Sequence, residues 1–189
     1  MPDDAIRQHT PHHESDGGDN SDEDFDCWES SDVDDEHFRR FCEARKPMEQ
    51  LPLSLTVNHE LLKDPWYNGP IKVSFGIGVS FDTLIDYAVR RKLIERHRVT
   101  EGPQDLIDSA SNVAVYNVVE HLKNISGARY MWFSLPIALD VDVVIDLYDN
   151  YTKEDYEMEE QDEKEVFEIV RSELGIPADE TPKWWFIQD

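Results

Sequence analysis

Residues 131–147 read MWFSLPIALDVDVVIDL, and every odd position in this stretch is apolar. Alternation of apolar and polar residues is typical of a β-strand with one buried face. A single strand of this length would exceed about 50 Å at roughly 3.3 Å per residue, and Pro136 lacks the N–H that a strand donates. The pattern therefore predicts two strands, or one strand bent sharply at Pro136, with the odd positions in the core.

A second alternating stretch, IKVSFGIGVSF at 71–81, has apolar odd positions and small or charged even positions. At Ser80, a good helix N-cap, the apolar period becomes that of a helix, which we expect to reach about residue 96. A further helix is expected to begin at Pro103 and to close at Gly127. These patterns predict a strand followed by two helices.

Shorter signals complete the expected fold. LPLSLTVN at 51–58 alternates like another strand, and Thr152 with Asp155 matches a capping box that opens a third helix ending at Gly175. KWWFIQD at 183–189 predicts a short edge strand or a docked tail. Strands and helices in this order favour the α+β class. We therefore expect one compact α+β domain over 48–189, with a mixed or antiparallel sheet of about four to five strands and about three helices.

The first 36 residues differ in composition from the rest of the chain. They hold 14 acidic residues and one arginine, which is −13 of a net charge of −24. Low hydrophobicity combined with high net charge cannot offset the entropy cost of ordering a chain. We predict that 1–36 is a disordered acidic tail and that 37–47 is a short helix or linker.

Charge and cysteine content restrict the class of protein. A net charge of −24 repels nucleic acid and anionic membranes, and it suits basic partners, metal cations or solubility. Cys27 and Cys42 are the only cysteines, too few for a disulfide framework, and no secretory signal or membrane-spanning run is recognisable. We expect a soluble cytoplasmic or nuclear protein that is not secreted and that binds a protein partner, not nucleic acid or membrane.

Gly76, Gly78 and Ser80 lie where a predicted strand passes into a helix. Free N–H groups at such a turn can bind an anion, which makes these residues a candidate ligand site. The third glycine of a dinucleotide fingerprint is missing, because Phe81 occupies its position. The favoured interpretation is that the glycines let another backbone or an aromatic ring lie against the strand.

Asp140, Asp142 and Asp146 occupy even positions of the alternating stretch, which we expect to face solvent. Two carboxylates two residues apart could share a hard cation. The neighbouring sequence offers no third or fourth ligand, so we predict neither a metal site nor any other cofactor.

The densest basic stretch of the chain contains Arg90, Arg91, Lys92, Arg96 and Arg98. The acidic tail carries two aromatic residues among its acids, Phe25 and Trp28. One hypothesis is that the tail or an anionic partner binds the basic stretch, with these aromatic residues as anchors. The alternative is that the basic residues form the solvated face of a helix.

Three classes of function remain open at this point. The favoured one is a non-enzymatic interaction or adaptor protein with an acidic regulatory tail. The second is a small enzyme, or a domain that binds an anionic ligand such as a nucleotide at the Gly76–Ser80 turn. The third is an acidic mimic of nucleic acid or a histone-type chaperone. No residue is assigned a catalytic role. A pocket with converging polar groups beside the turn would favour the second class, and a groove without them the first.

Overall fold

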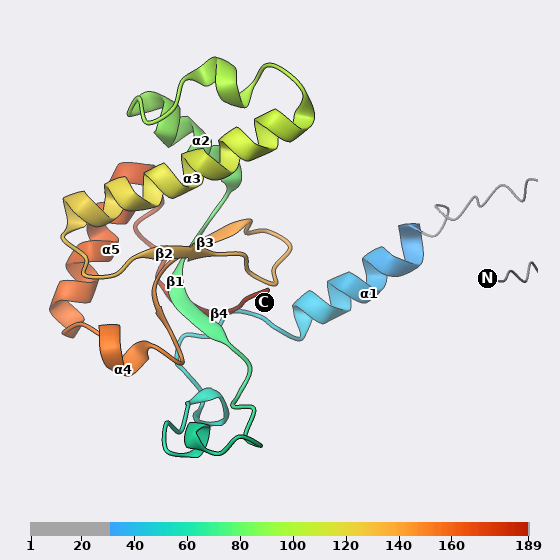
Figure 1. Cartoon of the computed structure of the whole chain (residues 1–189), viewed down its shortest axis with the longest axis vertical. Helices are drawn as coiled ribbons and strands as arrows, with labels where there is room; N and C mark the ends of the chain where they lie inside the picture. The colour runs from blue at the N-terminus through green and yellow to red at the C-terminus, as the bar shows by residue number, and fades with distance from the viewer. Residues whose placement is uncertain (1–30, 189) are drawn as a thin grey trace, which may run out of the picture.

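A computed structural model describes residues 31–188 of the chain (Figure 1). It contains a four-stranded antiparallel sheet in the order β2-β3-β1-β4, which confirms the predicted α+β class. The elements are α1 (Ser31–Glu43), β1 (Val73–Val79), α2 (Phe81–Arg90), α3 (Gln104–Ser126), β2 (Trp132–Ser134), β3 (Val143–Asp149), α4 (Lys153–Tyr156), α5 (Glu160–Leu174) and β4 (Lys183–Phe186), together with the one-turn 3₁₀ helices η1 (Leu53–Leu55), η2 (Leu61–Lys63) and η3 (Arg96–Val99).

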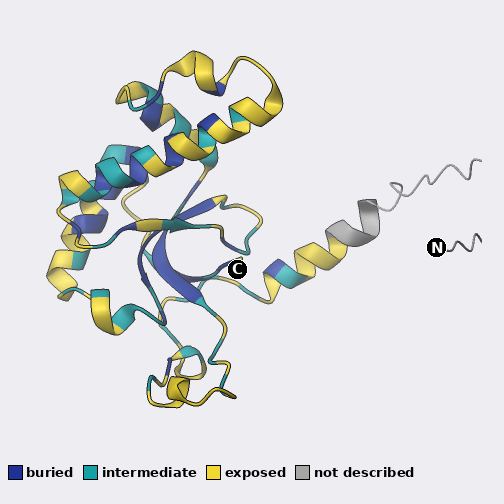
Figure 2. Ribbon diagram, in the orientation of Figure 1, coloured by how far each residue is buried: buried dark blue, intermediate teal, exposed yellow. Residues whose placement is uncertain are grey.

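The main core lies between one face of the sheet and the helices α2, α3 and α5 (Figure 2). The alternating apolar residues of β1 and β3 point into it, as their period predicts. They meet the apolar stripes of the three helices, whose spacing of three to four residues places one face of each helix on the sheet. The central members of this core are Val73, Phe75, Ile77, Leu84, Tyr87, Val118, Leu122, Val143, Ile145, Phe167 and Val170.

The opposite face of the sheet is covered by the chain itself. Ile137 donates its N–H to the carbonyl of Phe186 (2.8 Å), and Gln188 donates to the carbonyl of Leu135 (2.9 Å). The segment after β2 therefore pairs with β4 and its extension. Because β2 and β4 are the two edges of the sheet, this contact closes the sheet around a small second interior. Val144 and Trp185 are buried there, at 0% and 8% exposure.

The long alternating stretch divides at Pro136, as predicted, into β2 and β3. The expectation that all its odd positions are buried is wrong for Leu135 and Leu139, which lie in the connection and are exposed. The expectation that Asp146 faces solvent is also wrong, since this residue is 3% exposed. Closure of the sheet is the reason, because it turns the even positions of β3 inward.

Several local predictions are confirmed. The hydroxyl of Ser80 accepts a hydrogen bond from the N–H of Thr83 (3.2 Å) and caps α2. Gly127 and Gly175 end α3 and α5 in the left-handed conformation, with φ of 71° and 70°. β4 forms at the predicted edge, and Trp184 and Trp185 are buried within the domain.

Other local predictions differ from the structure. LPLSLTVN forms no strand, because the outer edge of β4 is already taken by Met48 and Ile137. The helix expected from Thr152 is divided into α4 and α5, and the predicted capping box does not form. The hydroxyl of Thr152 donates to the carboxylate of Asp149 (3.0 Å), which precedes the helix, and caps no N–H of α4. The prediction of a disordered tail over 1–36 falls outside the described residues for 1–30 and stays a prediction, and the helix α1 begins at Ser31.

The core predicted by alternation can be tested with one buried and one exposed apolar residue of the same stretch. Ile145→Ala removes a fully buried side chain and should lower the free energy of unfolding by about 2–5 kcal/mol. Leu139→Ala removes a side chain that is 59% exposed and should change it by less than about 0.5 kcal/mol. Urea denaturation followed by tryptophan fluorescence measures both values. Equal losses would show that the connection is as tightly packed as β3.

Candidate functional site

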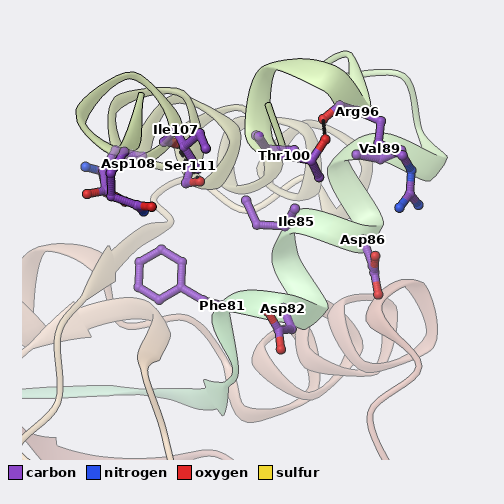
Figure 3. Close-up of a pocket in the computed structure, with 13 residues that line it drawn as sticks. Phe81, Asp82, Ile85, Asp86, Val89, Arg96, Thr100, Ile107, Asp108 and Ser111 are labelled. Atoms are coloured by element: carbon purple, nitrogen blue, oxygen red, sulfur yellow. Dashed lines mark hydrogen bonds between the residues drawn. The ribbon is translucent and has the colours of Figure 1, made fainter. Parts of the chain in front are cut away.

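A surface groove of about 680 Å³ lies between α2, η3 and the first half of α3 (Figure 3). Its floor is apolar and half-buried, and polar side chains form its rim. Figure 3 shows Phe81 and Ile85 projecting from α2 toward α3, with Asp108 at one end and Arg96 at the other. We call this feature the α2–α3 groove. The floor contains Phe81, Ile85, Val89, Val99 and Ile107, and the rim contains Asp82, Asp86, Arg96, Gln104, Asp108 and Asn112.

The sequence of α2 explains why the floor is apolar. Leu84, Tyr87 and Ala88 point into the main core and are fully buried. Phe81, Ile85 and Val89 follow one another at intervals of four residues, so they form a second apolar stripe along the same helix. This stripe packs at the margin of the core and faces a part of α3 whose buried residues begin only at Ala110, so it is only partly buried.

The rim of the groove is mainly acidic. Asp82 and Asp86 form no ion pair with any residue in the described range, while Asp108 accepts a hydrogen bond from the amide of Gln104 (2.8 Å). Arg96 likewise has no acidic partner within 31–188. The groove therefore presents three carboxylates and one guanidinium around an apolar floor.

The polar lining of the groove consists of carboxylates, one guanidinium, amides and two hydroxyls. No histidine or cysteine lines it, and its two hydroxyls are engaged with backbone carbonyls. Thr100 donates to the carbonyl of Arg96 (3.0 Å) and Ser111 to the carbonyl of Ile107 (2.8 Å). Within 31–188 no three His, Cys, Asp or Glu side chains are placed to hold a metal ion.

A second pocket of about 650 Å³ adjoins the Gly76–Ser80 turn, which the sequence marked as a candidate ligand site. Its lining includes two basic and two acidic side chains, which are Lys46, Lys183, Asp140 and Glu180. At the start of α2, however, the N–H of Phe81 donates to the carboxylate of Asp142 (2.9 Å). A carboxylate of the chain thus occupies the place that an anionic ligand would take at this helix end.

The two glycines of the turn have a structural role without any ligand. A Cβ on Gly76 would lie 2.2 Å from the backbone oxygen of Ile145, and one on Gly78 would lie 3.0 Å from the indole of Trp185. Only glycine at these two positions lets the backbone of β3 and the indole ring of Trp185 come this close to β1. Ligand binding by Gly76, Gly78 and Ser80 stays a prediction.

The basic stretch after α2 is divided into two parts by the structure. Arg91 forms an ion pair with Glu173 of α5, and Arg90 donates to the backbone carbonyl of Glu173 (2.7 Å). The hydrogen bonds from Arg91 and Tyr87 lower the pKa of Glu173. Lys92, Arg96 and Arg98 form no ion pair with the described residues. The predicted anchors Phe25 and Trp28 lie outside those residues, so docking onto this stretch stays a prediction.

Asp146 is a titratable residue whose burial the alternation pattern did not predict. It is buried in the second interior, where the Ser134 hydroxyl donates to its carboxylate (2.6 Å). Burial raises the pKa of Asp146 to about 6, although hydrogen bonds from Ser134 and Ser74 lower it. No local sequence signal marks this burial, because it follows from closure of the sheet.

Residues 53–71 form a lobe that projects from the body (Figure 1). Leu53 and Trp66 are 92% and 91% exposed. The base of the lobe is fixed by the buried side chain of Asn150, whose amide nitrogen donates to the carbonyls of Leu55 (2.8 Å) and Ile71 (3.0 Å). The lobe is thus held firmly at its base, whereas its apolar tip has no packing role.

Comparison of the chain with protein families, with curated protein sequences and with solved structures found no match. None of the helices within the described range has the length and apolarity required to cross a bilayer. The function is therefore argued from the geometry of the chain itself.

The buried carboxyl of Asp146 should make stability depend on pH. Its folded pKa of about 6 lies above the ordinary value of 3.8, so its contribution is fully present below about pH 4 and is lost as pH rises through 6. Asp146→Asn keeps an acceptor for Ser134 and removes the titration. Between pH 4.5 and 7.5, the natural protein should lose about 2 kcal/mol more unfolding free energy than the variant, at roughly 1.4 kcal/mol per pKa unit. Parallel pH profiles of the two proteins would show that Asp146 is not the titrating group.

The lobe can be tested with a pair of substitutions at its base and tip. Asn150→Ala leaves buried backbone groups without partners and should lower the free energy of unfolding by about 2–4 kcal/mol. Trp66→Ser should change it by less than about 0.5 kcal/mol, because this ring is almost fully exposed. Thermal and urea unfolding of both variants check these values. A large loss from Trp66→Ser would mean that the ring packs against the domain.

Proposed function

We propose that this chain is a non-enzymatic interaction protein whose α2–α3 groove binds a short segment of a partner protein, with apolar residues on one side and basic residues beside them. The observation that carries the proposal is a groove with a partly buried apolar floor under a rim of three carboxylates. An apolar cleft with a few polar groups at its edge is the usual form of a binding site.

The size and shape of the groove suit a peptide segment. A volume of about 680 Å³ accommodates several side chains, within the usual range for binding clefts. Phe81, Ile85 and Val89 are spaced one helical turn apart, so a partner helix could place apolar residues at matching intervals. Apolar grooves that bind amphipathic helices recognise side chains spaced at such helical intervals.

The charges of the rim favour a basic partner segment. Asp82 and Asp86 have no ion pair in the described part of the chain, so lysine or arginine residues beside the apolar anchors gain attraction. Each exposed ion pair contributes less than about 1 kcal/mol. Burial of apolar side chains on the floor therefore supplies most of the affinity, and the carboxylates supply orientation and selectivity.

The other two classes of function receive less support. For an anion or nucleotide site at the Gly76–Ser80 turn, the carboxylate of Asp142 stands at the helix end where the anion would bind. For a nucleic-acid mimic or histone-type chaperone, the basic residues Lys92, Arg96 and Arg98 interrupt the negative surface. The proposed role requires no cofactor. The cytoplasmic or nuclear location expected from the sequence stays a prediction.

The proposal can be tested with two synthetic amphipathic peptides of about 14 residues, four helical turns. Both carry the same leucine face, and their polar faces carry lysine in one and glutamate in the other. Methyl NMR spectra of the full chain report on Ile85, Val89 and Ile107 during titration. The lysine peptide should shift these methyl signals at about tenfold lower concentration than the glutamate peptide, which corresponds to roughly 1.4 kcal/mol.

Variants of the rim separate groove binding from general attraction to an acidic protein. Asp82→Asn combined with Asp86→Asn should weaken the lysine peptide about threefold to tenfold. The control combines Glu154→Gln with Asp155→Asn on α4, which removes the same charge from exposed positions outside the groove. Equal weakening by both pairs, or no shift of the three groove methyl groups, would contradict the proposal.

A further inference from the structure

Lys92 has an unusual backbone conformation at the end of α2. Its φ is 58°, and it is the only non-glycine residue with positive φ within 31–188. The N–H groups of Lys92 and Leu93 donate to the carbonyls of Val89 (3.1 Å) and Ala88 (2.8 Å). This is the Schellman arrangement of a helix end, in which the left-handed position is normally glycine. A lysine in this conformation is less favourable than glycine, so the backbone does not by itself account for the residue at this position.

Arg96 and Arg98 add two further exposed cations close to Lys92 in the sequence. None of the three has an acidic partner in the part of the chain that the structure describes, although the chain holds 42 acidic residues. The neighbouring Arg90 and Arg91, by contrast, are engaged with Glu173. We call Lys92, Arg96 and Arg98 the basic surface. Three neighbouring cations that no described carboxylate neutralises create a local positive field, which attracts an anionic segment.

We infer that residues 19–29 of the same chain dock on the basic surface. This segment reads DNSDEDFDCWE, with six acidic residues, no basic residue and the two aromatic side chains of Phe25 and Trp28. It is separated from the start of α1 only by Ser30. Its charge is complementary to that of the basic surface, and its aromatic residues can add apolar contact.

Tethering within one chain favours this docking. The 12 residues from Asp19 to Ser30 reach up to roughly 40 Å when extended. A tether of this length holds the segment at an effective concentration on the order of millimolar. Several exposed ion pairs, each weak alone, are then sufficient to keep the docked form populated.

Docking would also regulate the groove, and this part of the inference rests on the proposed function. Arg96 lies in both the basic surface and the rim of the α2–α3 groove. A segment held by Arg96 brings Phe25 and Trp28 toward the apolar floor that a partner would use. A basic partner attracts the acidic segment as well, so it both displaces the segment and takes its place.

The two cysteines provide a direct test in the unaltered full-length chain. Cys42 is buried at 5% exposure, so a thiol-reactive nitroxide label is directed to Cys27, in the middle of the docking segment. The label broadens amide NMR signals of the groups near it. At low salt, signals of residues 92–100 should lose at least about half their intensity, and most should return in 0.5 M NaCl as screening removes the attraction. Unchanged signals of 92–100 at low salt would overturn the inference.

Matched variants assign the broadening to the basic surface. Arg96→Gln combined with Arg98→Gln should abolish it. Arg129→Gln combined with Lys164→Gln removes the same charge from exposed positions elsewhere and should leave it intact. An equal loss in both pairs would mean general attraction without a defined site, which contradicts the inference.

Lys92→Gly distinguishes the contribution of the Lys92 charge to docking from its effect on folding. The substitution removes one cation and at the same time relieves the disfavoured backbone conformation. The equilibrium constant for folding should rise roughly fivefold, the usual preference for glycine at such a position. The broadening of signals 92–100 should fall at the same time. A more stable variant with unchanged broadening would remove Lys92 from the docking surface.

A mixed sample and the peptide titration test the other possible occupants of the basic surface and of the groove. When labelled chains without ¹⁵N are mixed with unlabelled ¹⁵N chains, broadening of 92–100 would assign the contact to a second copy and overturn docking within one chain. The lysine-peptide titration is read from groove methyl signals and does not depend on the label. Docking without peptide binding would refute only the groove function, and peptide binding without broadening would refute only the docking.

Discussion

The closure of a short sheet on itself is the constraint on which the rest of the structure depends. The backbone pairing of Ile137 with Phe186 and of Gln188 with Leu135 joins the two edges of four antiparallel strands. It buries Trp185 and Asp146 without a covering helix. Because the second face is closed in this way, the helices α2, α3 and α5 all pack on the other face. The same pairing occupies the edge of β4, so the alternating residues at 51–58 find no strand to pair with and form part of the lobe.

The groove lies where the first part of α3 packs beside α2 and η3. The buried residues of this 23-residue helix begin only at Ala110, so residues 104–109 contribute no fully buried side chain. The second apolar stripe of α2 lies beside this part of α3 and stays only partly buried. The groove thus depends on how α2 and α3 pack together, not on a local motif.

Local periodicity predicted what depends on local structure. The alternation of β1 and β3, the cap at Ser80 and the glycine ends of α3 and α5 could all be recognised from neighbouring residues. What depends on distant pairing could not be recognised. The burial of Asp146 requires the closed sheet, and nothing in the local pattern distinguishes the groove residues Phe81 and Ile85 from ordinary core positions. Glu173 neutralises Arg91 from 82 residues away in the sequence, so the sequence alone gave no reason to divide the basic stretch.

The rim of the groove carries charges of both signs, so it can attract two kinds of segment. Asp82, Asp86 and Asp108 favour a basic segment, and Arg96 favours an acidic one, over a single apolar floor. On the proposed function, an acidic segment of the chain held at Arg96 would form part of the surface that a basic partner first meets, because the two competing occupants carry opposite charges and attract each other. Long-range attraction would raise the rate of encounter, and the apolar floor would decide which segment remains bound. A strongly acidic chain of this design would draw basic proteins to itself in general and still select among them, because selection would take place on the floor of the groove and not in the field of the whole molecule.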